Sequence, residues 1–158
     1  IAKEEHIRIL FAGGGADRAR LEKIVRERRL ENIVMIPRQP KDQMPKVWSL
    51  CDISLVHLKD SPLFKTVIPS KIFESMAMGL PILMALPVGE ATDIIEEHKV
   101  GINVSPGCPK ELSEKFLVLA NDKELVKMLS CQSLNAAQNF DRKKFALEML
   151  NYMEEVVS

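Results

Sequence analysis

An apolar run bracketed by two prolines constrains the fold of this chain most strongly. Residues 81–87 read Pro-Ile-Leu-Met-Ala-Leu-Pro. A short, uninterrupted apolar segment of this kind is typical of a strand that is buried on both faces. Such strands occur in parallel sheets that helices cover on both sides. The run therefore predicts an interior strand of an α/β domain.

A helix is predicted immediately before this strand. Pro69 suits the first position of a helix, because its missing N–H costs nothing there. Apolar residues then recur at helical spacing up to Ala77. Gly79 stands where a left-handed C-terminal cap is expected, and Pro81 prevents the helix from continuing.

The rest of the chain alternates strand and helix patterns. Expected strands cover residues 6–12, 32–37, 51–58, 81–87 and 101–104, and expected helices cover 17–30, 42–50, 69–79, 91–98, 109–121, 123–139 and 141–157. This alternation predicts an α/β fold: a Rossmann-like, open parallel sheet of five strands with helices on both faces. With 158 residues, the chain is long enough for a single domain, 1–158, with one core.

Composition narrows the classes of function. The chain has 22 basic and 22 acidic residues, so no overall field favours nucleic acid or an acidic membrane. Its three cysteines are widely spaced, and no His/Cys cluster indicates a metal. We expect a reduced, cytosolic protein with buried thiols, no metal and no other cofactor. We also expect its methionines to be mainly core filler.

The start of the helix after Pro69 is a candidate anion site. The amides of the first helical turn, around Ser70, Lys71 and Ile72, are expected to lack acceptors within the helix and to carry the positive end of its dipole. Lys65, Thr66, Ser70 and Lys71 add two cations and two hydroxyls around this turn, and Glu74 is placed to reach sugar hydroxyls beside a bound phosphate. The alternative is an ordinary helix start with solvated lysines and a surface glutamate.

Two further turns are expected at the same edge of the sheet. Gly13–Gly15 follows the first strand, and Arg38 and Gln39 follow the second. Ligands of open α/β sheets bind beyond the carboxyl ends of the strands, so Gly14, Gly15 and the Arg38 loop are candidate contacts. Tight-turn geometry also explains the glycines, and a surface carboxylate also explains Arg38. The full dinucleotide spacing and its acidic residue are lacking, which disfavours an NAD-dependent oxidoreductase.

Taken in order, these motifs resemble a known family. The strand with G-G-G, the segment N-I-V-M-I-P-R-Q-P, and P-S-K-I-F-E-S-M-A-M-G-L-P-I-L with its closing G-E resemble the C-terminal, nucleotide-sugar-binding half of family 4 retaining glycosyltransferases, which have the GT-B fold. The variant P-S-K-I-F-E is similar to enzymes that build bacterial surface polysaccharides by adding amino sugars such as N-acetyl-fucosamine. The resemblance covers nearly the whole chain.

The resemblance implies roles for individual residues. Two glutamates flank the sugar-nucleotide in this family; the ribose-binding one falls on Glu74, while the other falls on Thr66, which is not acidic. The Arg38–Gln39 loop corresponds to the base-contacting segment, and amides near 68–70 correspond to the diphosphate cradle. No catalytic residue is assigned. The nucleotide-sugar-binding set implied in this way is Gly14, Gly15, Arg38, Gln39, Lys65, Thr66, Ser70, Lys71 and Glu74.

For the whole protein, the resemblance implies transfer of a sugar from a nucleoside-diphosphate sugar, expected to be UDP-linked, to a polysaccharide or lipid-linked acceptor. It implies a cytoplasmic location at the inner face of the membrane, with peripheral membrane association of the full-length enzyme. The family's N-terminal acceptor domain, the first strand of this half and an Arg/Lys pair that clamps the diphosphate are not found in the sequence. We therefore expect an inactive fragment that self-associates through the helix at 141–157.

Two other functions stay open at this point. The first is a GT-B-fold epimerase or hydrolase acting on UDP-sugars, which would need carboxylates or histidines around the cleft, where only Glu74 and Glu90 are evident. The second is a non-catalytic interaction domain whose ligand edge is vestigial. Nucleotide binding that depends on Glu74 separates the last of these from the enzymes.

Overall fold

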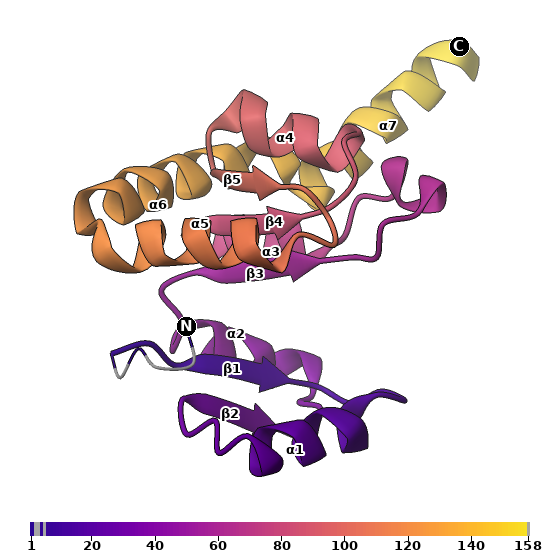
Figure 1. Ribbon diagram of the computed structural model, residues 1–158. Helices are drawn as coiled ribbons and strands as arrows, with labels where there is room; N and C mark the ends of the chain where they lie inside the picture. Colours follow the sequence, from indigo (N-terminus) through magenta and orange to yellow (C-terminus); the bar gives the residue numbers. More distant parts are fainter. Residues whose placement is uncertain (2–3, 5, 158) are drawn as a thin grey trace.

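The computed structural model of the chain describes residues 1, 4 and 6–157. Its strands and helices follow the predicted order (Figure 1). The elements are β1 (Ile9–Ala12), α1 (Arg18–Glu27), β2 (Ile33–Ile36), η1 (Lys41–Gln43), α2 (Met44–Trp48), β3 (Ser54–His57), η2 (Pro62–Lys65), α3 (Lys71–Ala77), β4 (Ile82–Ala85), α4 (Glu90–His98), β5 (Gly101–Val104), α5 (Pro109–Asn121), α6 (Lys123–Ala137), η3 (Gln138–Phe140) and α7 (Arg142–Val157).

All paired strands are parallel, and their arrowheads point to the same side in Figure 1. The α/β class is therefore confirmed. The strands do not form one continuous sheet, however: β1 pairs with β2, and β3–β4–β5 form a separate sheet. The expectation of a single sheet is wrong for the described residues, because β1 and β3 share no ladder of hydrogen bonds there.

Burial of β4 on both faces organises the larger sheet. Ile82 and Met84 point into a core under α3 and α4, while Leu83 and Ala85 point into a second core under α5. Fully burying an aliphatic side chain contributes roughly 1.5–3 kcal/mol, so β4 is the main anchor of this sheet. Helix α6 packs against α3, α4 and α5 and contributes Ala136 to the first core and Leu129 to the second. The buried partners are Val56, Ile72, Met76, Leu86, Ala91, Ile95, Val100 and Ala136 on the first face, and Val104, Leu119 and Leu129 on the second.

The turn from α3 into β4 has the geometry predicted at Gly79. Gly79 is left-handed (φ 67°), and its N–H donates to the carbonyl of Met76 at 2.9 Å. The N–H of Leu80 donates to the carbonyl of Ser75 at 2.9 Å, which completes a Schellman motif. The hydroxyl of Ser133 on α6 donates to the Leu80 carbonyl at 3.0 Å. The turn thereby fixes the direction in which α3 lies on the sheet.

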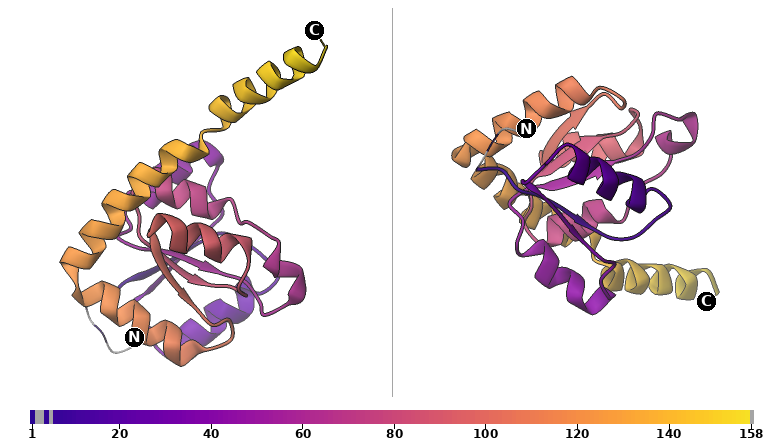
Figure 2. Two further views of the ribbon diagram at one scale, coloured as in Figure 1. Left: turned by 90° about the horizontal axis from the view of Figure 1, so that it is seen from above. Right: turned by 60° about the horizontal axis from the view of Figure 1, so that its bottom comes forward.

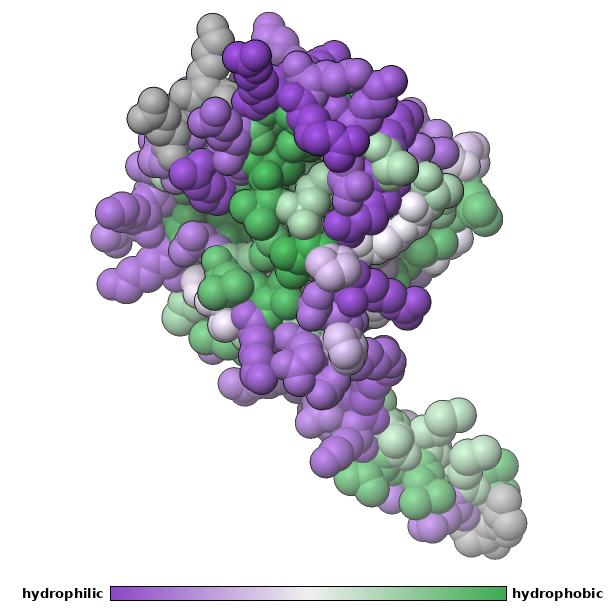
Figure 3. Space-filling model, turned by 90° about the horizontal axis from the view of Figure 1, so that it is seen from below, coloured by the Kyte–Doolittle hydropathy of each residue, from purple (hydrophilic) through white to green (hydrophobic). Residues whose placement is uncertain are grey.

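Hydrophobic side chains are also exposed on the face formed by the smaller sheet. Viewed from the side of β2 and α1, the surface shows a hydrophobic area between hydrophilic ones (Figure 3). Phe11 on β1, Leu21 on α1 and Val34 on β2 are exposed. The thiols differ from expectation in part, since Cys108 and Cys131 are exposed and only Cys51 is half-buried. Burial, and then the charge of Asp52, raise the pKa of the Cys51 thiol.

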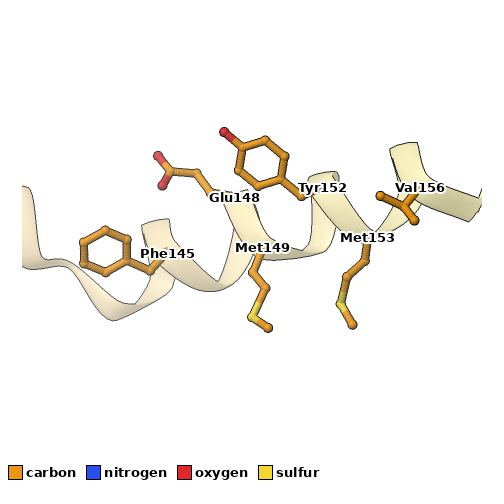
Figure 4. A pocket seen from close by; sticks show the side chains of 6 residues that line it. All are labelled: Phe145, Glu148, Met149, Tyr152, Met153 and Val156. Carbon is orange, nitrogen blue, oxygen red and sulfur yellow. The ribbon is translucent and has the colours of Figure 1, made fainter.

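Helix α7 projects from the body of the molecule (Figure 2). Its described side chains, 142–156, are all exposed. Phe145, Met149, Tyr152 and Val156, spaced four, three and four residues apart, form one apolar face together with Met153 (Figure 4). No described helix is both long and apolar enough to cross a bilayer. Because isolated helices of roughly this length form only marginally in water, the apolar face favours contact with a partner.

We predict that this chain self-associates through α7. Replacing Met149 and Tyr152 together by glutamate puts two charges on the apolar face and is expected to shift the chain to monomer. Asn151→Glu, an exposed polar position of the same helix, is the control for added charge. Sedimentation velocity over a concentration series measures the effect, and a wild-type chain that stays monomeric throughout would contradict the prediction.

Candidate functional site

The carboxyl ends of the parallel strands form one edge, and a charged residue follows two of its turns. Asp17 follows the glycine turn and Lys59 follows β3. The pKa of Asp17 is lowered, first by a hydrogen bond and charge interaction with Arg20 and further by the positive charge of Lys59. The positive charge of Lys59 therefore acts on Asp17 although β1 and β3 are not paired.

The glycine turn is open to solvent on its outer side. Gly13 (φ 152°) and Gly15 (φ 155°) have backbone conformations that favour glycine, and no atom lies within 4 Å of a Cβ built on any of Gly13–Gly15. Gly14 and Gly15 are exposed, as a ligand contact requires. Backbone can approach a ligand closely at such a turn.

Arg18 ties this turn to the end of β2. Its Nη1 donates to the carbonyls of Gly13 and Ile36, the latter at 2.7 Å, and its Nε donates to Glu22 Oε1 at 2.8 Å. Ile36 is the last residue of β2. The sequence prediction did not include Arg18. The sequence did contain an indication of this role. An arginine at the first position of a helix is unfavourable with the helix dipole, so its presence there suggests that it interacts with groups outside the helix.

Arg38 and Gln39, the two predicted residues of the loop after β2, differ in their exposure to solvent. Arg38 is exposed and forms no ion pair within the part of the chain that the structure describes, so the surface-pair alternative is not found there. Gln39 is half-buried, and its Nε2 donates to the Pro37 carbonyl at 2.9 Å. The Arg38 guanidinium is therefore the more accessible group of the loop.

Helix α3 begins two residues later than predicted. It starts at Lys71, with Ser70 as its N-cap and Pro69 before the cap. The Pro69 carbonyl accepts a hydrogen bond from the N–H of Ile72 at 3.1 Å, in a turn that precedes the helix. The Ile72 amide is consequently not available to a ligand, contrary to the sequence prediction. The amides of Ser70 and Lys71 have no acceptor among the described residues.

Glu74 lies at the start of α3 beside Ser70. The Ser70 hydroxyl donates to Glu74 Oε1 at 3.2 Å, and both residues are exposed. Lys65 and Lys71 are exposed and form no ion pair with any described residue. Since Ser70, Lys71 and Glu74 are all exposed, this helix start is accessible from solvent.

The loop that carries Lys65 and Thr66 packs directly on the start of α4. A Cβ built on Gly89 would lie 2.1 Å from the Lys65 carbonyl oxygen, so only glycine permits this contact. The Gly89 N–H donates to Thr92 Oγ1 at 2.9 Å, which holds the residue at the helix start. Gly89 thus positions the Lys65–Thr66 segment, a role that the sequence prediction missed.

The predicted residues are brought together in two groups. Arg18 joins the glycine turn to the loop of Arg38, and a hydrogen bond joins Ser70 to Glu74. No hydrogen bond or ion pair between described residues joins one group to the other, and both lie at the carboxyl edge of the strands. Among the described residues no group of three His, Cys, Asp or Glu side chains is placed to hold a metal.

Parallel strands flanked by helices, with a glycine turn and accessible polar loops at their carboxyl edge, define the class of Rossmann-like domains of the GT-B type. Residues 1–135 match the sequence profile of the family described as "Glycosyl transferases group 1", and the chain belongs to this family. The matched range contains the whole candidate site.

Solved structures support the same fold. Sucrose-phosphate synthase from Thermosynechococcus elongatus is 18% identical with a TM-score of 0.79, and the match covers 99% of this chain and 40% of that one. Anabaena HepE in complex with UDP-glucose is 18% identical with a TM-score of 0.76, covering 94% and 41%. A mutant of S. aureus TarM, in complex with fondaparinux, alpha-GlcNAc-glycerol and UDP, is 15% identical with a TM-score of 0.76, covering 94% and 29%. The chain thus spans less than half the length of each. A search of curated proteins found no match.

The contact at Gly89 leads to a prediction about the neighbouring loop. Gly89→Ala places a methyl group against the Lys65 carbonyl and is expected to displace residues 62–66, at a cost of about 1–3 kcal/mol. Faster hydrogen exchange in this segment measures the displacement. Gly14→Ala, where the added methyl meets no atom within 4 Å, is the matched control. Unchanged exchange at 62–66 in Gly89→Ala would contradict this account of the contact.

Proposed function

We propose that this chain is the donor-binding half of a glycosyltransferase and binds a UDP-linked sugar at the carboxyl edge of its strands. Two comparisons support the proposal: the chain's membership of the glycosyltransferase group 1 family, and two structures of similar fold, TarM in complex with UDP and HepE in complex with UDP-glucose. Within the chain, one feature carries it.

That feature is the exposed carboxylate of Glu74 at an accessible helix start. Held beside Ser70, it is placed to accept hydrogen bonds from a pair of ribose hydroxyls. The amides of Ser70 and Lys71 then lie on the side where the diphosphate would follow the ribose, and the unpaired ammonium groups of Lys65 and Lys71 add positive charge. Thr66 stands at the position of the family's sugar-binding glutamate and would present a hydroxyl to the donor sugar instead.

The chemistry of transfer explains why these groups are cationic or N–H donors. As the bond between the sugar and the diphosphate breaks, negative charge develops on the leaving diphosphate. Preorganised N–H groups and ammonium groups stabilise that charge, which lowers the barrier to transfer. In this proposal Lys71 and the two free amides of α3 act on the leaving group, while Arg38 and Gln39 contact the base.

The whole protein would transfer the sugar, in our proposal an N-acetyl amino sugar, to a polysaccharide or lipid-linked acceptor. This corresponds to a family 4 retaining enzyme that works in the cytoplasm, at the inner face of the membrane. Since the chain spans about 40% of the sucrose-phosphate synthase chain it matches, we place acceptor binding in a part of the protein outside residues 1–158. The 158-residue chain alone is then expected to bind the donor without transferring its sugar.

Calorimetric titration with UDP, GDP and their sugars tests the proposal. Wild-type chain should bind UDP, and Glu74→Ala should weaken binding about tenfold or more, because hydrogen bonds to a charged group contribute roughly 1.5–3 kcal/mol. Glu97→Ala, which removes an exposed glutamate of α4, should bind as wild type. Absence of nucleotide binding by the wild-type chain, or unchanged affinity in Glu74→Ala, would argue against it.

A further inference from the structure

We propose that Arg18 is a positioning residue that turns the Gly13–Gly14 peptide so that the Gly14 N–H faces the ligand and donates to a phosphoryl oxygen of the bound nucleoside diphosphate. The inference rests on the proposed function and assigns a new contact within that site. It is argued from the hydrogen bonds of Arg18, the stereochemistry of one peptide unit and the open space beside it.

The first step concerns the direction of one carbonyl group. Arg18 is the first residue of α1, and its Nη1 donates to the carbonyl oxygen of Gly13. The same nitrogen donates to the carbonyl of Ile36 at 2.7 Å, and the Gly13 N–H also donates to Ile36 at 3.2 Å. The guanidinium therefore lies at the ends of β1 and β2, and the Gly13 carbonyl points toward it.

The second step follows from the planarity of the peptide. In a trans peptide the C=O and the following N–H point in opposite directions, and no cis peptide occurs among the described residues. Because the Gly13 carbonyl points to the guanidinium at the end of β2, the Gly14 N–H points away from β2. In Figure 1, β2 and β3 lie on opposite sides of β1.

The third step is that this amide is available. The Gly14 N–H has no acceptor within the described part of the chain, and no atom lies within 4 Å of a Cβ built on Gly14. The positive charge of Lys59, beyond β3, acts on the pKa of Asp17, so one cation and one carboxylate lie near this turn. A phosphoryl oxygen there would meet the Gly14 N–H as a hydrogen-bond donor.

The environment of Arg18 also explains why the residue is an arginine. Its guanidinium uses Nη1 for two carbonyls and Nε for Glu22, a fork of donors that a single ammonium group does not reproduce. Its side chain is 26% exposed, so the group is largely packed and held in one direction. Arg20, two residues later, forms only an exposed ion pair with Asp17 and provides a control on the same helix.

The test follows the backbone amides of isotope-labelled chain by NMR during titration with UDP and, separately, with inorganic pyrophosphate. In wild type, the Gly14 amide should shift with both ligands, since pyrophosphate carries the oxygens but no base. Arg18→Met should weaken binding of both about tenfold and abolish the Gly14 shift. Arg18→Lys should be intermediate, and Arg20→Met should behave as wild type. Thermal unfolding of each variant separates loss of fold from loss of the contact.

The outcomes distinguish this inference from the proposed function. Wild type that binds UDP without a shift at Gly14, or Arg18→Met that binds as tightly as wild type, overturns the role of Arg18 and leaves the proposed function standing. Wild type that binds neither UDP nor pyrophosphate contradicts the proposed function, and the inference falls with it. If Arg18→Met does not fold, two other results test the role of Arg18. The Gly14 amide of wild type should shift with both ligands, and Arg18→Lys should bind both more weakly than wild type.

Discussion

Burial of β4 on both faces is the constraint on which the rest of the structure depends. Its side chains alternate between two cores, one under α3 and α4 and the other under α5. Because both faces are occupied, the end of α3 and the start of α4, which flank β4 in the sequence, have fixed positions relative to the sheet. The Schellman turn at Gly79 sets α3 against β4, and the start of α4 at Gly89 receives the η2 loop.

These contacts place polar groups at one edge while leaving that edge open. The Gly89 contact brings the Lys65 loop to the start of α4, the Ser70 hydroxyl holds Glu74 at the start of α3, and Arg18 links the glycine turn to β2. The Gly89 contact and the Ser70 hydroxyl add no large side chain at the strand ends, while the Arg18 guanidinium lies against the ends of β1 and β2. Binding of an anionic nucleotide there would use backbone amides whose positions the packed elements already fix, so these amides would lose little ordering entropy on binding.

Local chemistry made much of this predictable from sequence. The proline-bracketed run predicted a strand buried on both faces, and Gly79 predicted a left-handed cap; both are confirmed. The split into two sheets was not predictable, because strand patterns do not specify which edges bond. Nor was the role of Arg18, which depends on carbonyls that the fold brings together. The prediction that the methionines fill the core is wrong on α7, where Met149 is exposed. The amphipathic pattern of this helix is the same whether its apolar face packs on the core or stays exposed, so the sequence could not distinguish the two.

A crystal structure of this chain with bound UDP tests the central claim most directly. The account predicts that the diphosphate lies at the carboxyl edge of the strands, between the Gly14 amide and the amides of Ser70 and Lys71, with the ribose hydroxyls on Glu74. UDP bound on a helical face, or at the opposite edge of the sheets, would contradict it.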